Sequence, residues 1–96
     1  MSTLVAESDF LAAVRDLATL HGWRCYHTRD SRGSDPGFPD LVCVRGPRLV
    51  ALETKTTLGR VTRAQLRWMD ALRAVPGVEA WVARPDDWDA IEEVLR

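Results

Sequence analysis

GFPDLVCVRGPRLVALETK, the run from Gly37 to Lys55, is the stretch of sequence that decides the fold. Two apolar segments, 41–44 and 49–52, lie on either side of the turn sequence Arg45-Gly-Pro-Arg48. Short apolar segments separated by a Gly-Pro turn are typical of paired strands. The stretch therefore predicts a β-hairpin whose strands are both buried on both faces.

The register of this hairpin brings two carboxylates together. A turn centred between Gly46 and Pro47 places Asp40 directly opposite Glu53, and opposed residues on antiparallel strands have Cβ atoms about 5 Å apart. Lys55 lies two residues beyond Glu53 and so on the same face. A carboxylate pair in apolar surroundings is costly unless something compensates it. Two compensations are open: a shared proton, which raises one pKa, or a divalent cation, where oxygen ligands favour Mg²⁺ or Mn²⁺.

The rest of the chain predicts three helices and two more strands. They are read from apolar periodicity, capping residues and turn residues. The predicted segments are a helix at 8–21, a strand at 23–28, a loop at 29–38, a helix from Thr62 to near Pro76, a strand at 78–83 and a helix from Pro85. The order αβββαβα indicates an α/β fold, a mixed sheet flanked by helices.

Length and composition add further expectations. With 96 residues, 46% of them hydrophobic, residues 1–96 are expected to form one domain with a thin core, to which a partner subunit would add stability. The chain has no apolar run of about 18 residues and no basic leader, so we expect no membrane span, no secretory signal and a cytoplasmic location. Cys25 and Cys43 lie in apolar segments without C-x-x-C spacing, which indicates reduced thiols.

Charge is unevenly distributed, although the net charge is only −1. Basic residues outnumber acidic ones over residues 24–73, while the segments before and after are net acidic. An anionic partner would therefore meet the middle of the chain. Lys55 is the only lysine in a sequence whose other basic residues are all arginines, so it is a candidate for a role that needs an ammonium group.

Pro39-Asp40 followed, after twelve residues, by Glu53-Thr-Lys55 resembles the signature of the PD-(D/E)XK nuclease superfamily. With Gly37-Phe38 before it and Gly59-x-x-Thr-x-x-Gln-x-x-Trp68 after it, the string resembles the VRR-NUC branch found in short stand-alone phage and prophage proteins. The likeness covers nearly the whole chain. It implies a restriction-endonuclease-like fold and a homodimeric, Mg²⁺- or Mn²⁺-dependent endonuclease that cuts duplex or branched DNA, such as four-way Holliday junctions.

The resemblance also implies roles for individual residues. Asp40 and Glu53 would be the metal-binding acids, and the backbone carbonyl of Thr54 would be a third ligand. Lys55 would be the catalytic lysine. Gln65 matches the glutamine that lies near the site at the start of the following helix, and it would belong to the catalytic group.

Residues outside the hairpin complete the predicted site. Glu7 matches an additional acid that the first helix contributes to the metal, directly or through water, and Asp9 is the competing candidate. Arginines and hydroxyl groups in loops beside a metal site suit contacts to the phosphate backbone. The candidate DNA-binding residues are His27, Arg29, Ser31, Arg32, Arg60 and Arg63.

Simpler interpretations exist for each of these residues. Asp40 could be a turn residue, and Glu53 with Lys55 could be a surface ion pair, which contributes little. Gln65 could serve only as the capping partner of Thr62, and the loop arginines could be ordinary solvated residues. The rival function is a non-catalytic module that binds nucleic acid or protein on the same fold. An RNase or a sequence-specific restriction nuclease is a third possibility.

Overall fold

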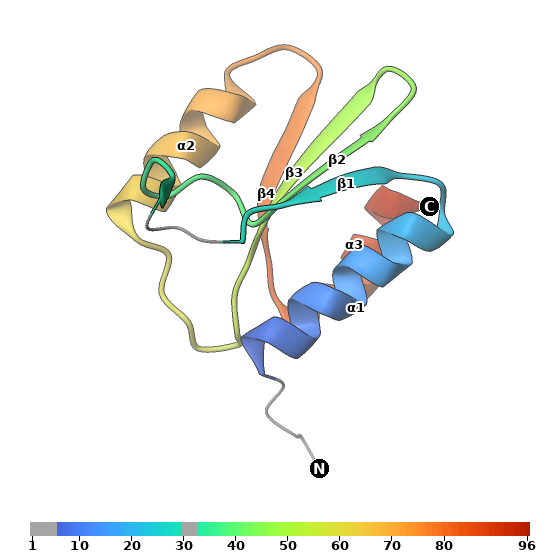
Figure 1. Ribbon diagram of the computed structural model, residues 1–96, viewed down its shortest axis with the longest axis horizontal. Coiled ribbons are helices and arrows are strands. Elements are labelled where there is room, and N and C mark those ends of the chain that lie inside the picture. The colour runs from blue at the N-terminus through green and yellow to red at the C-terminus, as the bar shows by residue number, and fades with distance from the viewer. Residues whose placement is uncertain (1–5, 30–32) are drawn as a thin grey trace.

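The computed structural model describes residues 6–29 and 33–96 (Figure 1). In chain order its elements are α1 (Glu7–Leu20), β1 (Arg24–His27), β2 (Leu41–Arg45), β3 (Arg48–Thr54), α2 (Arg63–Arg73), β4 (Val78–Ala83), the short 3-10 helix η2 (Pro85–Asp87) and α3 (Trp88–Leu95). The order confirms the predicted αβββαβα arrangement. Within the described ranges, none of the helices has the length and apolar character needed to cross a membrane.

The four strands form one mixed sheet in the order β1-β2-β3-β4. Strands β1, β2 and β3 pair antiparallel, and β3 pairs with β4 in parallel. A parallel pair needs a crossover connection, and α2 provides it between β3 and β4 (Figure 1). The predicted α/β class with a mixed sheet flanked by helices is confirmed.

The β2–β3 hairpin has the predicted register. Arg45 pairs with Arg48 and Leu41 pairs with Leu52. One further step along the same register places Asp40, just before β2, across from Glu53 near the end of β3.

Helices α1 and α3 cover one face of the sheet, and the larger apolar core lies beneath them (Figure 1). At its edge the buried indole of Trp23 donates a hydrogen bond of 2.8 Å to the carbonyl of Leu95, the last residue of α3. The buried residues of this cluster are Phe10, Val14, Ala18, Trp23, Leu41, Cys43, Val50, Leu52, Ala83, Ile91 and Leu95.

Helix α2 covers the other face only in part. Its Met69 packs with Ala51 of β3 and Ala80 of β4 in a much smaller buried cluster. The prediction that both hairpin strands are buried on both faces is correct for β3 from residue 50 onward and wrong for β2, where Val44 is 42% exposed. The reason is the position of α2, which packs over β3 and β4 and leaves this face of β1 and β2 open (Figure 1).

Candidate active site

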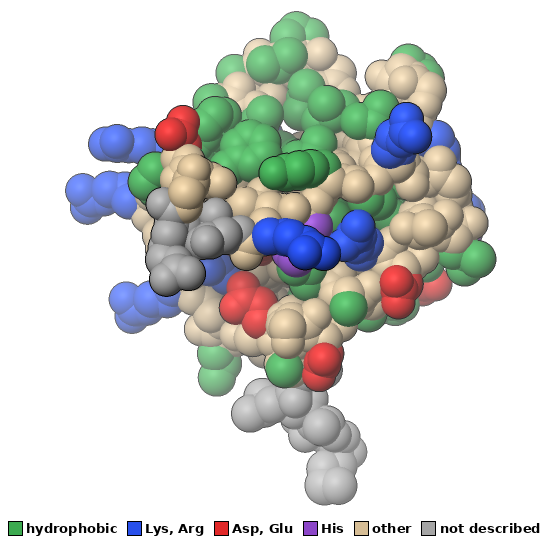
Figure 2. Space-filling view, viewed as in Figure 1, with side chains coloured by type: hydrophobic (Ala, Val, Ile, Leu, Met, Phe, Trp, Pro, Cys, Tyr) green, Lys and Arg blue, Asp and Glu red, His purple; other side chains and the backbone are tan. Residues whose placement is uncertain are grey.

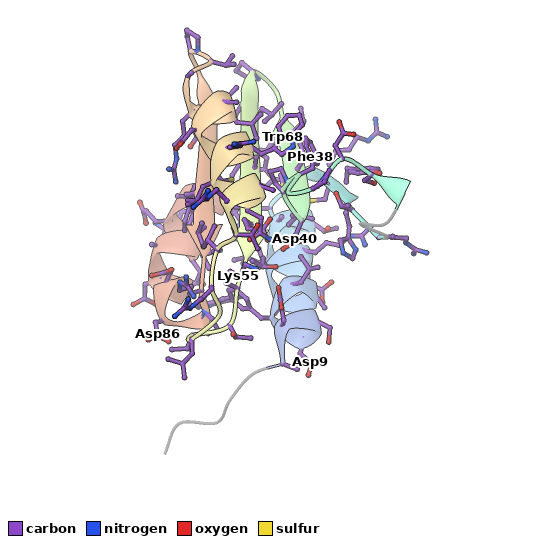
Figure 3. The ribbon with its side chains drawn as sticks, turned by 90° about the vertical axis from the view of Figure 1, so that its left-hand side faces the viewer. Asp9, Phe38, Asp40, Lys55, Trp68 and Asp86 are labelled. Atoms are coloured by element: carbon purple, nitrogen blue, oxygen red, sulfur yellow. The ribbon has the colours of Figure 1, made fainter. Side chains whose placement is uncertain are left out.

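The loop before Asp40 is fixed against the start of α2. Gly37 has φ +87°, and a Cβ atom there would lie 2.3 Å from the carbonyl carbon of Ala64. Glycine permits both this conformation and this close approach. The next residue, Phe38, packs edge-on against Trp68 of α2, with ring centroids 5.0 Å apart (Figure 3). The Gly-Phe-Pro-Asp sequence thus attaches the first candidate acid to the helix that carries Gln65.

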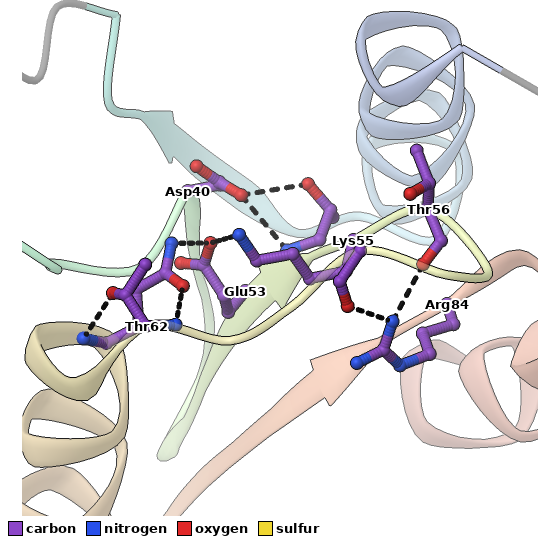
Figure 4. Close-up of polar contacts among 9 residues, drawn as sticks. Asp40, Glu53, Lys55, Thr56, Thr62 and Arg84 are labelled. Atoms are coloured by element: carbon purple, nitrogen blue, oxygen red, sulfur yellow. Dashed lines mark hydrogen bonds and ion pairs between the residues drawn. The ribbon is translucent and has the colours of Figure 1, made fainter.

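The Asp40 carboxylate is oriented by the end of β3. Its Oδ2 accepts hydrogen bonds from the backbone N–H of Thr54 at 3.0 Å and from the Thr54 hydroxyl at 2.9 Å (Figure 4). The backbone carbonyl of Asp40 accepts from the N–H of Thr28, just beyond β1, at 3.0 Å. These bonds hold the carboxylate over the sheet instead of leaving it free as a turn residue.

Glu53 is a buried carboxylate, with only 1% of its surface exposed. Its Oε2 accepts a 2.7 Å hydrogen bond from Gln65 Nε2 and lies 4.0 Å from Lys55 Nζ (Figure 4). Its Oε1 is buried and has no hydrogen-bond partner among the described residues. Burial, followed by the negative charge of Asp40, raises the pKa of Glu53 to about 8, although Lys55 acts in the opposite direction.

Lys55 and Gln65 complete the group from two directions. The Lys55 side chain is 13% exposed, and its backbone N–H donates to the carbonyl of Ala83 at the end of β4. Gln65 both caps the helix and lies at the site: its Oε1 accepts from the N–H of Thr62 in a capping box, while its Nε2 donates to Glu53. Its catalytic role stays a prediction. The site therefore lies where the start of β2, the end of β3 and the start of α2 meet (Figure 4).

Comparison with known proteins shows the family of the chain. The sequence model of the VRR-NUC domain matches residues 5–87, most of the chain. The chain belongs to the VRR-NUC family. A solved structure described as a VRR_NUC domain protein has the same fold, with a TM-score of 0.73 and 20% sequence identity over 97% of this chain and 87% of that chain. No curated protein shows significant similarity.

Membership in the VRR-NUC family, a family of nuclease domains, indicates that this chain is a nuclease that acts on DNA. The matched residues 5–87 include the cluster of polar side chains described above. The two carboxylates, the ammonium group and the glutamine that converge beside the end of β3 are the chemical groups of the predicted nuclease site.

The donor set of this VRR-NUC site fits a hard divalent cation. Mg²⁺ uses one or two carboxylates and fills its remaining positions with water and substrate phosphate oxygens. Asp40 and Glu53 supply two carboxylates, and the unpartnered Oε1 of Glu53 is a buried acceptor that an ion would satisfy. For Thr54 the structure shows the hydroxyl and N–H bound to Asp40, while the ligand role of its carbonyl stays a prediction.

The predicted contribution of α1 is not gathered into this cluster. Glu7 is exposed at the first residue of the helix, and Asp9 lies away from Asp40 and Lys55 (Figure 3). In the part of the chain that the structure describes, no three His, Cys, Asp or Glu side chains come together as a metal site. The fold therefore brings together two acids, and the role of Glu7 stays a prediction.

The predicted DNA-binding residues fall in two groups. His27, half-buried, and Arg29, exposed, lie at and just after the end of β1. Arg60 and Arg63 are exposed just before and at the start of α2. The remaining candidates, Ser31 and Arg32, lie outside the described residues.

Arg84 is a contributor that the sequence analysis did not identify. Its Nη1 donates to the carbonyls of Thr56 and Gly59, each at 2.7 Å, and so fixes the loop that follows Lys55 (Figure 4). A signal was present in the sequence: Arg84 directly follows the fourth strand. Because β4 runs parallel to β3, the two strands end at the same edge of the sheet, and Arg84 follows β4 just as Lys55 follows β3.

Proposed function

We propose that this VRR-NUC domain is a metal-dependent endodeoxyribonuclease that hydrolyses DNA phosphodiester bonds with Mg²⁺ or Mn²⁺ bound by Asp40 and Glu53. The observation that carries the proposal is the pair of carboxylates, buried Glu53 beside half-buried Asp40. Glu53 is held in an apolar sheet beside a second carboxylate, with one oxygen unpartnered among the described residues and an ammonium group 4.0 Å from the other. Without an ion, the raised pKa of Glu53 means that a proton relieves the repulsion between the two carboxylates, and a divalent cation can replace that proton.

Each residue of the site has a distinct task. Thr54 holds one oxygen of Asp40, and Gln65 holds one oxygen of Glu53, so both carboxylates are oriented before any ligand arrives. A bound divalent ion would supply Lewis-acid polarisation of the phosphodiester and lower the pKa of water. Lys55 places a positive charge beside the reacting phosphate and stabilises the negative charge that develops there.

The raised pKa of Glu53 couples metal binding to pH. The carboxyl must lose its proton before it can act as a ligand, and its pKa of about 8 means that it retains much of that proton at pH 7. Metal binding at pH 7 should therefore release a proton, and the metal affinity should rise with pH up to about 8. A titration of metal into the protein in two buffers of different ionisation enthalpy measures that release.

The experiment that tests the proposal separates metal binding from chemistry. Asp40→Asn should abolish both metal binding and cleavage, because it removes a ligand charge. Lys55→Ala should slow cleavage by about 10²- to 10³-fold while metal binding stays near that of the unaltered protein. Arg96→Ala, which changes an exposed arginine at the C-terminus, is the control and should cleave normally. Undiminished cleavage by Asp40→Asn or Lys55→Ala would contradict the proposal.

We propose further that the enzyme is a homodimer that prefers branched DNA such as four-way junctions. The support is the likeness of its motif string to short stand-alone VRR-NUC proteins, together with a chain of 96 residues that has a small core under α2. Light scattering should give twice the chain mass. Cleavage of a four-way junction should exceed that of linear duplex of the same sequence, and equal rates on the two would remove the structure preference.

A further inference from the structure

A cavity of about 440 Å³ opens along the free edge of β1, outside the carboxylate cluster. Arg15 of α1 forms one side of it, and Cys25 and His27 of β1 lie along the strand. Arg29 and Gly33, which follow β1 in the sequence, also line it. Figure 2 shows Lys or Arg side chains gathered with a histidine near the middle of this face of the molecule.

The cavity has the charge of an anion site. Two arginines and a histidine line it, and no carboxylate does so among the described residues. Asp16, the neighbour of Arg15, lines a different cavity of about 300 Å³ that shares Arg15 and His27. Neither Arg15 nor Arg29 forms an ion pair with a described residue. Two arginines therefore line one cavity with no counter-ion among the described residues.

Other arginines of this chain are used differently. Arg48 forms a two-bond ion pair with Glu79. Arg73 and Arg84 donate to backbone carbonyls of the fold. In each case the guanidinium stabilises the chain itself. Among the described residues Arg15 and Arg29 have no such partner, as is also true of Arg60 and Arg67, but only Arg15 and Arg29 line this cavity.

The cavity lies next to the candidate active site. His27 and Arg29 are the two neighbours of Thr28, whose N–H donates to the carbonyl of Asp40 and whose hydroxyl donates to the carbonyl of Pro39 at 3.1 Å. Thr28 therefore connects the edge of β1, where His27 and Arg29 line the cavity, to the backbone of Asp40. A strand with one phosphodiester at the carboxylates would carry another phosphate to the edge of β1.

We propose that Arg15, His27 and Arg29 form a phosphate subsite that holds the backbone of the DNA strand beside the phosphodiester to be cut. The inference rests on the proposed function, and it adds a residue of α1, Arg15, that the motif does not include. The subsite contributes affinity and register, because phosphate contacts position a nucleic acid without reading its sequence. Arginine suits this task since its planar guanidinium binds phosphate oxygens with two parallel hydrogen bonds.

The first test measures DNA binding without cleavage. A fluorescent oligonucleotide is titrated by anisotropy in EDTA at several salt concentrations, with unaltered protein, Arg15→Ala, Arg29→Ala and the charge-matched control Arg96→Ala. Each pocket variant should weaken binding equally for unrelated sequences. Each should also reduce the slope of log affinity against log salt by about 0.7 for single strands or 0.9 for duplex, the value of one lost phosphate contact. Affinities and slopes equal to those of Arg96→Ala would overturn the subsite.

The second test uses Cys25 as a reporter inside the cavity. Cys25 is half-buried and lines it, whereas Cys43 is fully buried, and its burial raises the pKa of the Cys43 thiol. A thiol reagent should therefore modify Cys25 first, as peptide mapping by mass spectrometry reports. Saturating DNA should slow this modification in the unaltered protein and much less in Arg15→Ala. Modification of Cys25 at an unchanged rate with DNA bound would overturn the subsite.

Failure of the subsite and failure of the proposed function give different results. Normal cleavage by the unaltered protein, with pocket variants that behave like Arg96→Ala, overturns the subsite and leaves the nuclease in place. DNA binding that depends on Arg15 and protects Cys25, in a protein that cleaves no DNA with either metal, supports the subsite and rejects the nuclease. The fold of each variant is checked by circular dichroism, so a loss of binding is not confused with unfolding.

Discussion

The two faces of the sheet differ in what they bury. Beneath α1 and α3 lies a continuous apolar core of eleven buried residues. Beneath α2 only Ala51, Met69 and Ala80 form a buried apolar cluster, and the same face carries the carboxylates of Asp40 and Glu53. The α1/α3 face holds the fold together, and the α2 face can therefore accommodate a buried charge that works against stability.

The largest expected effect compares truncations on the two faces. Leu52→Ala, beneath α1 and α3, should lower the free energy of unfolding by about 2–5 kcal/mol, since it leaves a cavity in a fully enclosed position. Met69→Ala should cost less, because its cluster is small and its neighbours Leu49 and Leu72 are only partly buried. Urea unfolding of both variants measures the difference, and a larger loss for Met69→Ala would reverse the assignment.

The second prediction concerns how the α2 face is attached to the site. Gly37→Ala should destabilise the protein by about 2–4 kcal/mol and reduce cleavage, because the new Cβ would meet the Ala64 backbone at 2.3 Å and separate the Asp40 loop from α2. Gly77 has a similar φ of +85° but nothing within 4 Å of an added Cβ. Gly77→Ala should therefore cost only about 1 kcal/mol, with cleavage unchanged. Equal effects would show that the contact with α2 is unimportant.

Features that a short segment determines could be predicted from the sequence. The hairpin, its register and the pairing of Asp40 with Glu53 follow from two apolar segments and one turn, which are local properties of residues 37–55. The strand at 78–83 and the capping box at Thr62 are local in the same sense. Each could be predicted because a short segment determines it.

Other features depend on how segments that are far apart in the sequence pack together, and they could not be predicted in this way. The packing of Gly37 on α2 joins residues far apart in the sequence, and so does the bond from Arg84 to the loop after Lys55. The incomplete cover of β2 depends on where α2 lies across the sheet, which its own periodicity does not determine. Among the described residues Glu7 does not form a three-acid cluster with Asp40 and Glu53, and this has the same origin, because the position of α1 against the sheet is set by its packing.

The third prediction measures the cost of charge on the α2 face. The pKa of Glu53 rises from its ordinary value of 4.5 to about 8 in the folded protein, so the folded state holds a proton that the unfolded state releases. Without divalent metal, the free energy of unfolding should therefore fall as pH rises from about 4.5 to 8, by at most about 1.4 kcal/mol per pH unit.

Glu53→Gln should remove this slope, because the amide is neutral at every pH in the window. The variant should then be more stable than the unaltered protein at pH 8, by an amount that shrinks towards pH 5. Glu93→Gln, at an exposed position on α3, is the control and should keep the slope. Thermal unfolding at a series of pH values measures the stability of the unaltered protein and of both variants. A slope that survives in Glu53→Gln would assign the cost to another group.

The smallest expected effect on stability comes from two arginines. The comparison tests whether Arg84 positions Lys55 or only stabilises the fold. Arg84→Ala and Arg73→Ala each remove a guanidinium that donates to backbone carbonyls, and each should cost about 1–2 kcal/mol in unfolding free energy. Only Arg84 holds the loop that follows Lys55. Arg84→Ala should therefore lower kcat about tenfold or more with little change in KM, since a displaced ammonium group no longer meets the charge of the transition state. Arg73→Ala should leave both constants unchanged. If the two variants lose activity in proportion to their lost stability, Arg84 only supports the fold.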